Sequence, residues 1–152
     1  MNPGAAQNYL RTKVLTATPE QLQMMLFDGA LRFGEQAKVA LGNSKFDESY
    51  ELISRVQKIV LELSCSLKHD IAPDICGKLS SLYNYVYRKL IEANISHDGA
   101  ALEEAIELLR YQRETWSMLL ERLAKDKAAK AALKLDMPAP DARMEASISF
   151  SG

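Results

Sequence analysis

Proline and glycine are scarce in this sequence, with 5 Pro and 7 Gly among 152 residues. Both residues disfavour the interior of a helix, proline by about 3 kcal/mol and glycine by about 1 kcal/mol relative to alanine. Long stretches rich in Leu, Ala, Glu and Lys lie between them. This composition favours helix over sheet, and the length suits a single domain with a sizeable core.

Cysteine is also rare, and no pattern of a targeting or membrane-spanning segment is present. Cys65 and Cys76 form no CxxC motif and have no histidine pair beside them, which is typical of free thiols rather than of a disulfide or a zinc site. The first residues lack a basic stretch followed by an apolar one, and no apolar run approaches ~18 residues. We therefore expect a cytoplasmic protein without membrane insertion.

No sign of charge dominates, since 19 Lys and Arg face 20 Asp and Glu for a net charge of −1. Proteins that bind nucleic acid usually have an excess of Lys and Arg, which this sequence does not have. The most basic stretch, LAKDKAAKAALK from Leu123 to Lys134, contains an acid and no aromatic residue. It predicts a solvated helix face, and we expect no nucleic-acid partner.

Histidine is too rare for the enzymatic site that helical bundles most often hold. A di-metal carboxylate site needs Glu-x-x-His on each of two helices, and neither His69 nor His97 follows a Glu by three residues. We interpret both as exposed helix-end residues rather than metal ligands. No glycine-rich phosphate loop and no Ser/His/Asp arrangement is present. We expect no catalytic, cofactor-binding or metal-binding residues, so the protein is not an enzyme.

A strong helix start is present at Thr18, followed by Pro19 and Gln21. Thr-x-x-Gln is a capping box, and proline at the first helical position loses only an amide that has no partner there. The helix is predicted from Pro19 to about Leu41, ending where Gly42 supplies a left-handed conformation. Its apolar residues exceed the needs of one face: we expect Leu22, Met25, Leu26 and Phe33 in the core, and Met24, Phe27 and Leu31 on a neighbouring face.

Three further helices are predicted from apolar residues spaced by three and four. They cover about Phe46 to Leu67, restarted by Ser44 with Asp47, then Pro73 to Ile95, then a segment from an N-cap at Asp98 to about Leu135. Short turns between them predict an all-α, antiparallel up-down-up-down four-helix bundle over residues 18–135. Residues 1–17 lack a regular period and form an N-terminal arm, and residues 136–152 form a flexible tail.

The second and third of these segments carry apolar residues beside their main stripe, as the first does. Met24, Met25 and Met118, and the tyrosines at 83, 85 and 87, can serve as adaptable contact residues, although core packing is the better interpretation for any one of them alone. A second stripe predicts a groove for an amphipathic or extended peptide, which the arm, with Tyr9, Leu10 and Val14, can fill when no partner is present.

Several motifs are similar to those of a known family. They are Tyr9 in the arm, then Val14, Thr16 and Ala17 before PEQLQMMLFDGALRF from Pro19, then RKLIEANIS from Arg88 to Ser96, and ELLRYQRETW from Glu107 to Trp116. In order and spacing, over about residues 9–123, the chain resembles the FliS family of export chaperones for flagellin.

The resemblance implies a non-enzymatic, cytoplasmic chaperone without a cofactor. Such a protein binds the disordered C-terminal region of newly made flagellin, prevents its premature polymerisation, and delivers it to the gate of the flagellar type III export apparatus. An alternative is a helical adaptor or regulator of flagellar assembly with a different partner. Either a monomer or a homodimer is compatible with the sequence.

At the residue level, the resemblance implies partner contacts on the arm, on the outer stripes of the second and third predicted helices, and from Arg88 to Ile95. Asp28 and Gly29 are expected to have a packing role, with Gly29 admitting either a neighbouring helix or the backbone of the arm, and Asp28 accepting a hydrogen bond there. Asn94 has an alternative role as a helix cap. The candidate partner-binding residues are Tyr9, Leu10, Val14, Met24, Phe27, Leu31, Leu52, Ile59, Tyr83, Tyr87, Arg88, Ile91, Asn94 and Ile95.

Overall fold

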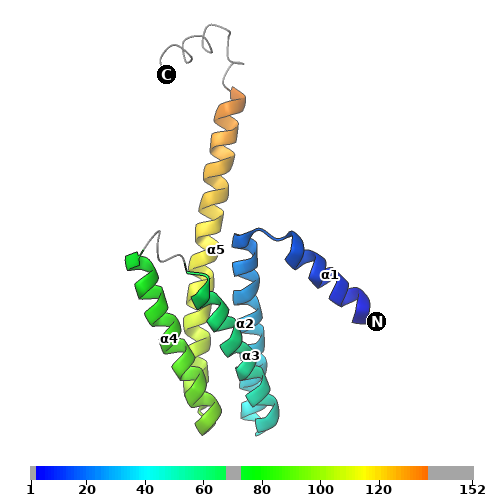
Figure 1. The fold of residues 1–152 in the computed structure, drawn as a ribbon, viewed down its shortest axis with the longest axis vertical. Coiled ribbons are helices and arrows are strands. Elements are labelled where there is room, and N and C mark those ends of the chain that lie inside the picture. Colours follow the sequence, from blue (N-terminus) through cyan, green and yellow to red (C-terminus); the bar gives the residue numbers. More distant parts are fainter. Residues whose placement is uncertain (1–2, 68–72, 137–152) are drawn as a thin grey trace. The chain divides into compact units, whose positions relative to one another are not determined.

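The computed structural model describes residues 3–67 and 73–136, and within these residues all regular structure is helical (Figure 1). The helices are α1 (Pro3–Thr16), α2 (Pro19–Gly42), α3 (Phe46–Cys65), α4 (Pro73–Ser96) and α5 (Gly99–Asp136). The predicted helix boundaries are thus met within one or two residues. The prediction for His69 and that for the tail beyond residue 136 lie outside the described residues.

The start of α2 has the predicted capping box. The Gln21 amide donates to the Thr18 hydroxyl at 3.1 Å, and the Thr18 amide donates to the Gln21 side chain at 3.0 Å. The end of α2 differs from the prediction, because Gly42 is still helical and the left-handed residue is Ser44, with φ 57°. Glycine usually lies just beyond the end of a helix, but here α2 includes Gly42 and so ends one residue later than predicted. The tight turn to α3 is made at Ser44.

The two other predicted helix starts have opposite outcomes. Ser44 with Asp47 does not cap α3, since its N-cap is Lys45 and no side-chain cap is formed. The prediction at Asp98 is confirmed, because the Ala101 amide donates to the Asp98 carboxylate at 3.1 Å just after α5 begins. Ser44 cannot serve as the cap because it is used in the left-handed turn one residue earlier.

The N-terminal arm is a helix, α1, although its sequence shows no clear helical period. Between Ala5 and Thr16 it contains neither proline nor glycine and several good helix formers, so it can form a helix without an apolar stripe. Ala17 and Thr18 then separate α1 from the capped start of α2. Arm and helix are therefore the same segment.

A single apolar core draws its buried side chains from α2, α3, α4 and the N-terminal part of α5. The largest fully buried side chains are Phe27, Ile53, Val56, Val60, Leu63, Val86, Leu90, Leu102, Ile106 and Leu109. The predicted stripes of α3, α4 and α5 are thereby confirmed at their centres but not at their ends, where Phe46 and Ile75 are exposed.

In the contacts between α2 and α5, residues near the start of α2 meet residues late in the core part of α5, and residues near the end of α2 meet residues near the start of α5. Trp116 donates its indole N–H to the Glu20 carbonyl at 3.2 Å, Arg113 bonds Asp28 at 2.6 Å, and Lys38 pairs with Glu103. Rising numbers on α2 meet falling numbers on α5, so these helices run in opposite directions. The predicted acceptor role of Asp28 is confirmed by its bond to Arg113.

Of the glycines in α2, Gly34 rather than Gly29 has the closest neighbouring side chain. A Cβ atom at Gly34 would lie 3.0 Å from Cγ1 of Ile106, whereas one at Gly29 would lie at an ordinary 3.5 Å from Cδ1 of Ile59. Both glycines are buried. Gly29 thus faces α3 as expected for a packing residue, but the tight spot is five residues further on.

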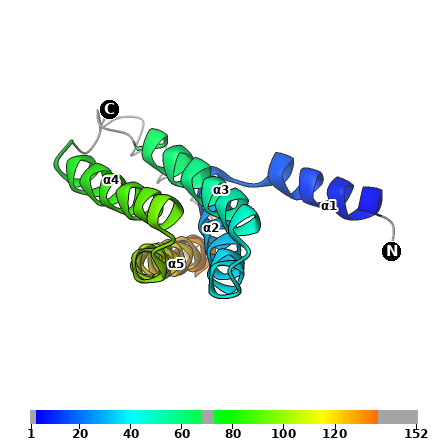
Figure 2. The ribbon, with the colours of Figure 1, turned by 90° about the horizontal axis from the view of Figure 1, so that it is seen from below.

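The turn before α3 and the turn before α5 are joined by an aromatic stack. The rings of Phe46 and His97 lie 3.7 Å apart and nearly parallel, and His97 has a left-handed φ of 51°. This contact brings the start of α3 to the end of α4, so these helices also run in opposite directions. In Figure 2, α3 lies beside both α2 and α4, with which it is in contact. His97 is exposed, as predicted.

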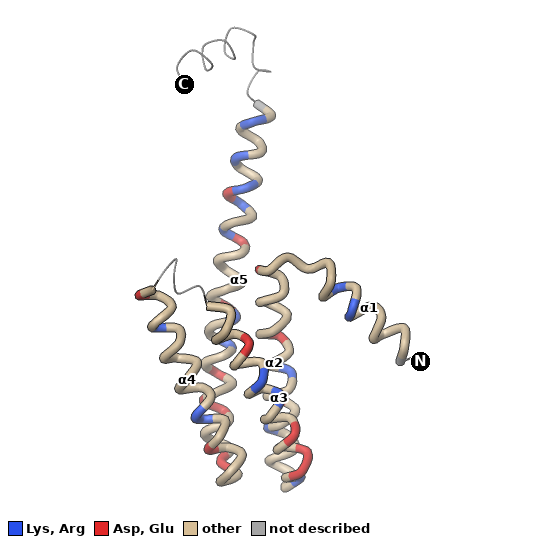
Figure 3. Tube along the Cα trace, viewed as in Figure 1, with Lys and Arg blue, Asp and Glu red and all other residues tan. Residues whose placement is uncertain are grey.

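The chain divides into two compact units, Met1–Trp116 and Ser117–Gly152, with the boundary inside α5. Every described side chain from 121 to 135 is exposed, as expected for a solvated helix face. Lys and Arg recur along this part of α5 (Figure 3). The predicted domain boundaries at residues 17 and 135 remain predictions.

Candidate functional site

The predicted partner-binding residues fall into three groups by burial. Phe27, Leu52 and Tyr83 are at most 9% exposed and belong to the core, so their placement on an outer face is wrong in this conformation. The spacing of apolar residues identified a second stripe on each helix, but α2, α3 and α4 each contact two other helices, so the core covers both stripes at these positions. Burial also raises the pKa of Tyr83 to about 12.

A second group is half-buried at the edge of the core. Leu31, Ile59 and Tyr87 pack against the buried cluster while retaining some exposed surface, and Met24 and Asn94 have intermediate exposure. Ile59 faces Gly29 on α2. Because part of each of these five side chains is already covered, only the remaining exposed part can contact a partner.

The third group is exposed and lies on two helices, α1 and α4. On α1, Tyr9 is 71%, Leu10 54% and Val14 41% exposed. Leu15, which is not among the candidate partner-binding residues, is 73% exposed. An unburied helix with this many large apolar side chains is typical of a segment that binds a partner.

On α4, Arg88, Ile91 and Ile95 share one outward face with Asn84, because these positions are separated by four, three and four residues. Ile95 is 77% exposed and Ile91 36%. The Phe46–His97 stack places Tyr50, which is 59% exposed one turn into α3, at the same end of the α3–α4 pair as Ile95. We call the residues Asn84, Arg88, Ile91 and Ile95 the α4 face.

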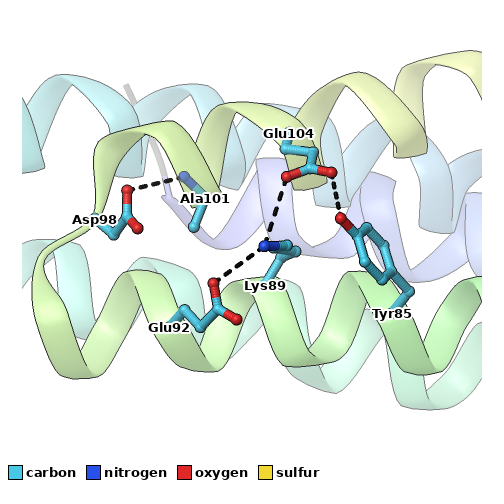
Figure 4. Close-up of polar contacts among 6 residues, drawn as sticks. All are labelled: Tyr85, Lys89, Glu92, Asp98, Ala101 and Glu104. Atoms are coloured by element: carbon cyan, nitrogen blue, oxygen red, sulfur yellow. Dashed lines mark hydrogen bonds and ion pairs between the residues drawn. The ribbon is translucent and has the colours of Figure 1, made fainter.

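The inner edge of α4 is tied to α5 by a polar cluster (Figure 4). Glu104 accepts a hydrogen bond from the Tyr85 hydroxyl and lies 3.7 Å from Lys89, which also bonds Glu92 at 3.2 Å. The hydrogen bond to Glu104 raises the pKa of Tyr85, and the bond to Glu92 raises that of Lys89. This cluster fixes which side of α4 faces α5 and so which side remains outward.

Several other exposed apolar residues were not predicted from the sequence. They are Val39, Tyr50, Leu61 and Tyr111, with exposed fractions between 48% and 71%. None belongs to a core stripe, and an isolated apolar residue outside a stripe gives no signal of its own because such residues are common on protein surfaces. Of these, Tyr50 lies at the same end of the α3–α4 pair as Ile95.

Metal-binding clusters, helices able to span a membrane and disulfides are absent from the described residues. Within residues 3–67 and 73–136, no cluster of His, Cys, Asp or Glu can hold a metal ion, and no helix is long and apolar enough to cross a membrane. Both cysteines are free thiols, Cys65 exposed and Cys76 buried. The exposed apolar faces of α1 and α4 are the features that the fold leaves unexplained.

Comparison with known proteins gives a consistent result. The family model for the flagellar protein FliS matches residues 1–123. A flagellar secretion chaperone FliS of Bacillus subtilis is 32% identical over 126 residues, covering 83% of this chain and 92% of its own. The FliS of Salmonella typhimurium is 33% identical over 115 residues, covering 75% and 85%.

A solved structure supports the same fold. The crystal structure of a bacterial flagellar chaperone superimposes with a TM-score of 0.64 at 18% identity, covering 78% of this chain and 97% of that one. At this identity the likeness concerns the fold alone. Together with the match over residues 1–123 and the relatives in Bacillus and Salmonella, the motifs that begin at Tyr9 and end at Trp116 place this chain in the FliS family.

Proposed function

We propose that the protein is a flagellar export chaperone that binds the C-terminal region of newly made flagellin in the cytoplasm, prevents its premature polymerisation, and delivers it to the export gate. The observation that carries this proposal is its membership of a family whose relatives are flagellar secretion chaperones. The exposed apolar residues of α1 and α4 provide surfaces suited to such a task.

The architecture that we infer for this role is an antiparallel up-down-up-down arrangement of α2 to α5. The opposite directions of α2 and α5, and of α3 and α4, support it. A disordered segment loses ordering entropy when it binds, at a cost of about 2–5 kcal/mol or more, so a long footprint is required. Several shallow apolar faces on a helical scaffold supply one without a deep pocket.

Titration calorimetry with a peptide of about 40 residues from the C-terminus of the same organism's flagellin tests the proposal. We expect a 1:1 complex and a negative heat-capacity change, because apolar surface leaves water on binding. Flagellin lacking this segment should not co-purify with the protein. Co-purification that survives its removal would contradict the proposal.

A pair of matched variants locates the surface. Ile95→Ser on the α4 face should weaken binding by about 1–2 kcal/mol, since it removes an apolar side chain that is 77% exposed and makes no core contact to lose. Val39→Ser is the control, because Val39 is 64% exposed in the last turns of another helix, α2. Equal effects of the two substitutions would mean that the α4 face is not the site.

The alternative is an adaptor or regulator of flagellar assembly that binds a different protein. The exposed faces fit that role equally well in chemical terms. A pull-down from cells lacking flagellin separates the two, because only an adaptor should still recover a strong partner.

A further inference from the structure

One arginine on the α4 face has no partner among the residues that the structure describes. Between Pro19 and Trp116, each of the other arginines contacts an aromatic ring or a carboxylate. Arg32 and Arg55 lie over the Phe33 ring at 5.2 and 5.4 Å, Arg110 pairs with Glu35 at 2.7 Å, and Arg113 pairs with Asp28 at 2.6 Å. Arg88 is exposed, and no carboxylate or aromatic ring of the described residues contacts its guanidinium group.

Glu92, the carboxylate best placed on α4 to pair with Arg88, already forms an ion pair with another residue. Glu92 lies four residues after Arg88, a spacing at which side chains of a helix meet. Its carboxylate instead bonds Lys89 at 3.2 Å, and Lys89 also lies near Glu104 on α5 (Figure 4). The polar cluster therefore holds Glu92 toward α5 and leaves the guanidinium of Arg88 unpaired on the outward side.

The surroundings of Arg88 differ along the helix. Toward the N-terminus of α4 the outward positions are Gly77, Ser81 and Asn84, which are exposed and small or polar, and a Cβ at Gly77 would meet nothing within 4 Å. Toward the C-terminus they are Ile91 and Ile95. A cation thus lies next to an aliphatic patch on an otherwise open face.

We propose that Arg88 pairs with a carboxylate of the cargo segment, whose apolar side chains cover Ile91 and Ile95. This inference rests on the proposed function and names the chemistry that the site would select. At 1.5 Å per residue, Ile91 and Ile95 lie about one and two turns from Arg88. The matching cargo is an amphipathic helical segment with an Asp or Glu one to two turns from its aliphatic residues.

Arginine suits this role because its planar fork donates two parallel hydrogen bonds to one carboxylate. An apolar contact beside the pair excludes water from it, which strengthens an interaction that is weak when fully solvated. The aliphatic residues would then provide affinity, and Arg88 would select the register and direction in which the segment lies.

The test compares Arg88→Glu with Lys78→Glu in the full chain, using the flagellin C-terminal peptide as the probe. Lys78 is an exposed cation on another side of the same helix, so the control makes the same change of charge. We expect Arg88→Glu to raise the Kd about tenfold to a hundredfold and Lys78→Glu about threefold at most. Thermal unfolding should be the same for both variants because both side chains are exposed.

A rescue experiment identifies the pairing itself. Each Asp and Glu of the peptide is replaced in turn by Lys, and one of these peptides should bind the Arg88→Glu variant more tightly than the wild-type peptide does. Equal losses for the two variants, or no rescue by any peptide, overturns the pairing while leaving the proposed function intact. A wild-type protein that does not bind the wild-type peptide overturns both.

Discussion

At the scale of single residues, Gly34 is the described glycine with the least room for a side chain, because α5 lies against it. A methyl group there would lie 3.0 Å from Cγ1 of Ile106, a side chain that is 1% exposed and enclosed by the core. We expect Gly34→Ala to destabilise the protein by about 1–3 kcal/mol, since overpacking outweighs the gain in helix propensity of about 1 kcal/mol. The free energy of unfolding in urea measures this.

The matched control is Gly77→Ala in α4. A Cβ atom at Gly77 would meet nothing within 4 Å, so only the helix propensity changes and the variant should be more stable by up to about 1 kcal/mol. A stabilised Gly34→Ala protein would show that α2 and α5 can move apart at this position without cost.

At the scale of elements, α1 differs from the other helices because it supplies nothing to the described core. Its large apolar side chains are 41% to 73% exposed. Removing residues 1–16 keeps the Thr18 capping box, so we expect cooperative thermal unfolding with a midpoint within a few degrees of the full chain and weaker binding of the flagellin peptide. Circular dichroism and calorimetry measure the two effects, and loss of the cooperative transition would show that α1 is part of the core.

At the scale of the whole molecule, stability should depend on pH through Tyr83. Burial raises its pKa from 10.0 to about 12 in the folded protein. Between these values the unfolded chain loses the phenol proton while the folded chain keeps it, so stability is complete below pH 10 and falls as the pH rises towards 12. We expect this decline in the unfolding free energy to be less steep in Tyr83→Phe, which lacks the titrating group; equal slopes would mean that Tyr83 does not cause it.

The prediction of the helices succeeded because their signals are local. The capping box at Thr18, the N-cap at Asp98 and the spacing of apolar residues in α3 and α5 depend only on neighbours in the chain, and the structure has them all. The predictions at Gly42 and Ser44 failed because two residue types suited to the turn compete there, and the geometry of the α2–α3 connection decides between them.

The candidate site was less predictable than the helices. A stripe of apolar residues can lie against one neighbour, against two, or against none, and the sequence does not distinguish these cases. Phe27 and Tyr83 belong to secondary stripes that the core covers, whereas Ile91 and Ile95 belong to one that it does not. The exposed residue Tyr50 has no stripe and became a candidate only through its position beside α4.

The sequence alone determined the helical class, the approximate extent of α2 to α5 and the family, because composition, capping and ordered motifs are properties of the chain itself, whereas the helix α1 was not predicted. Only the tertiary structure decided which apolar faces are core and which remain outside, since burial depends on the neighbours that each face acquires. It also decided that Glu92 is held by Lys89 and that Arg88 is left outward. Which charged side chains pair depends on how the helices lie against one another, and this cannot be read from the amino-acid sequence alone.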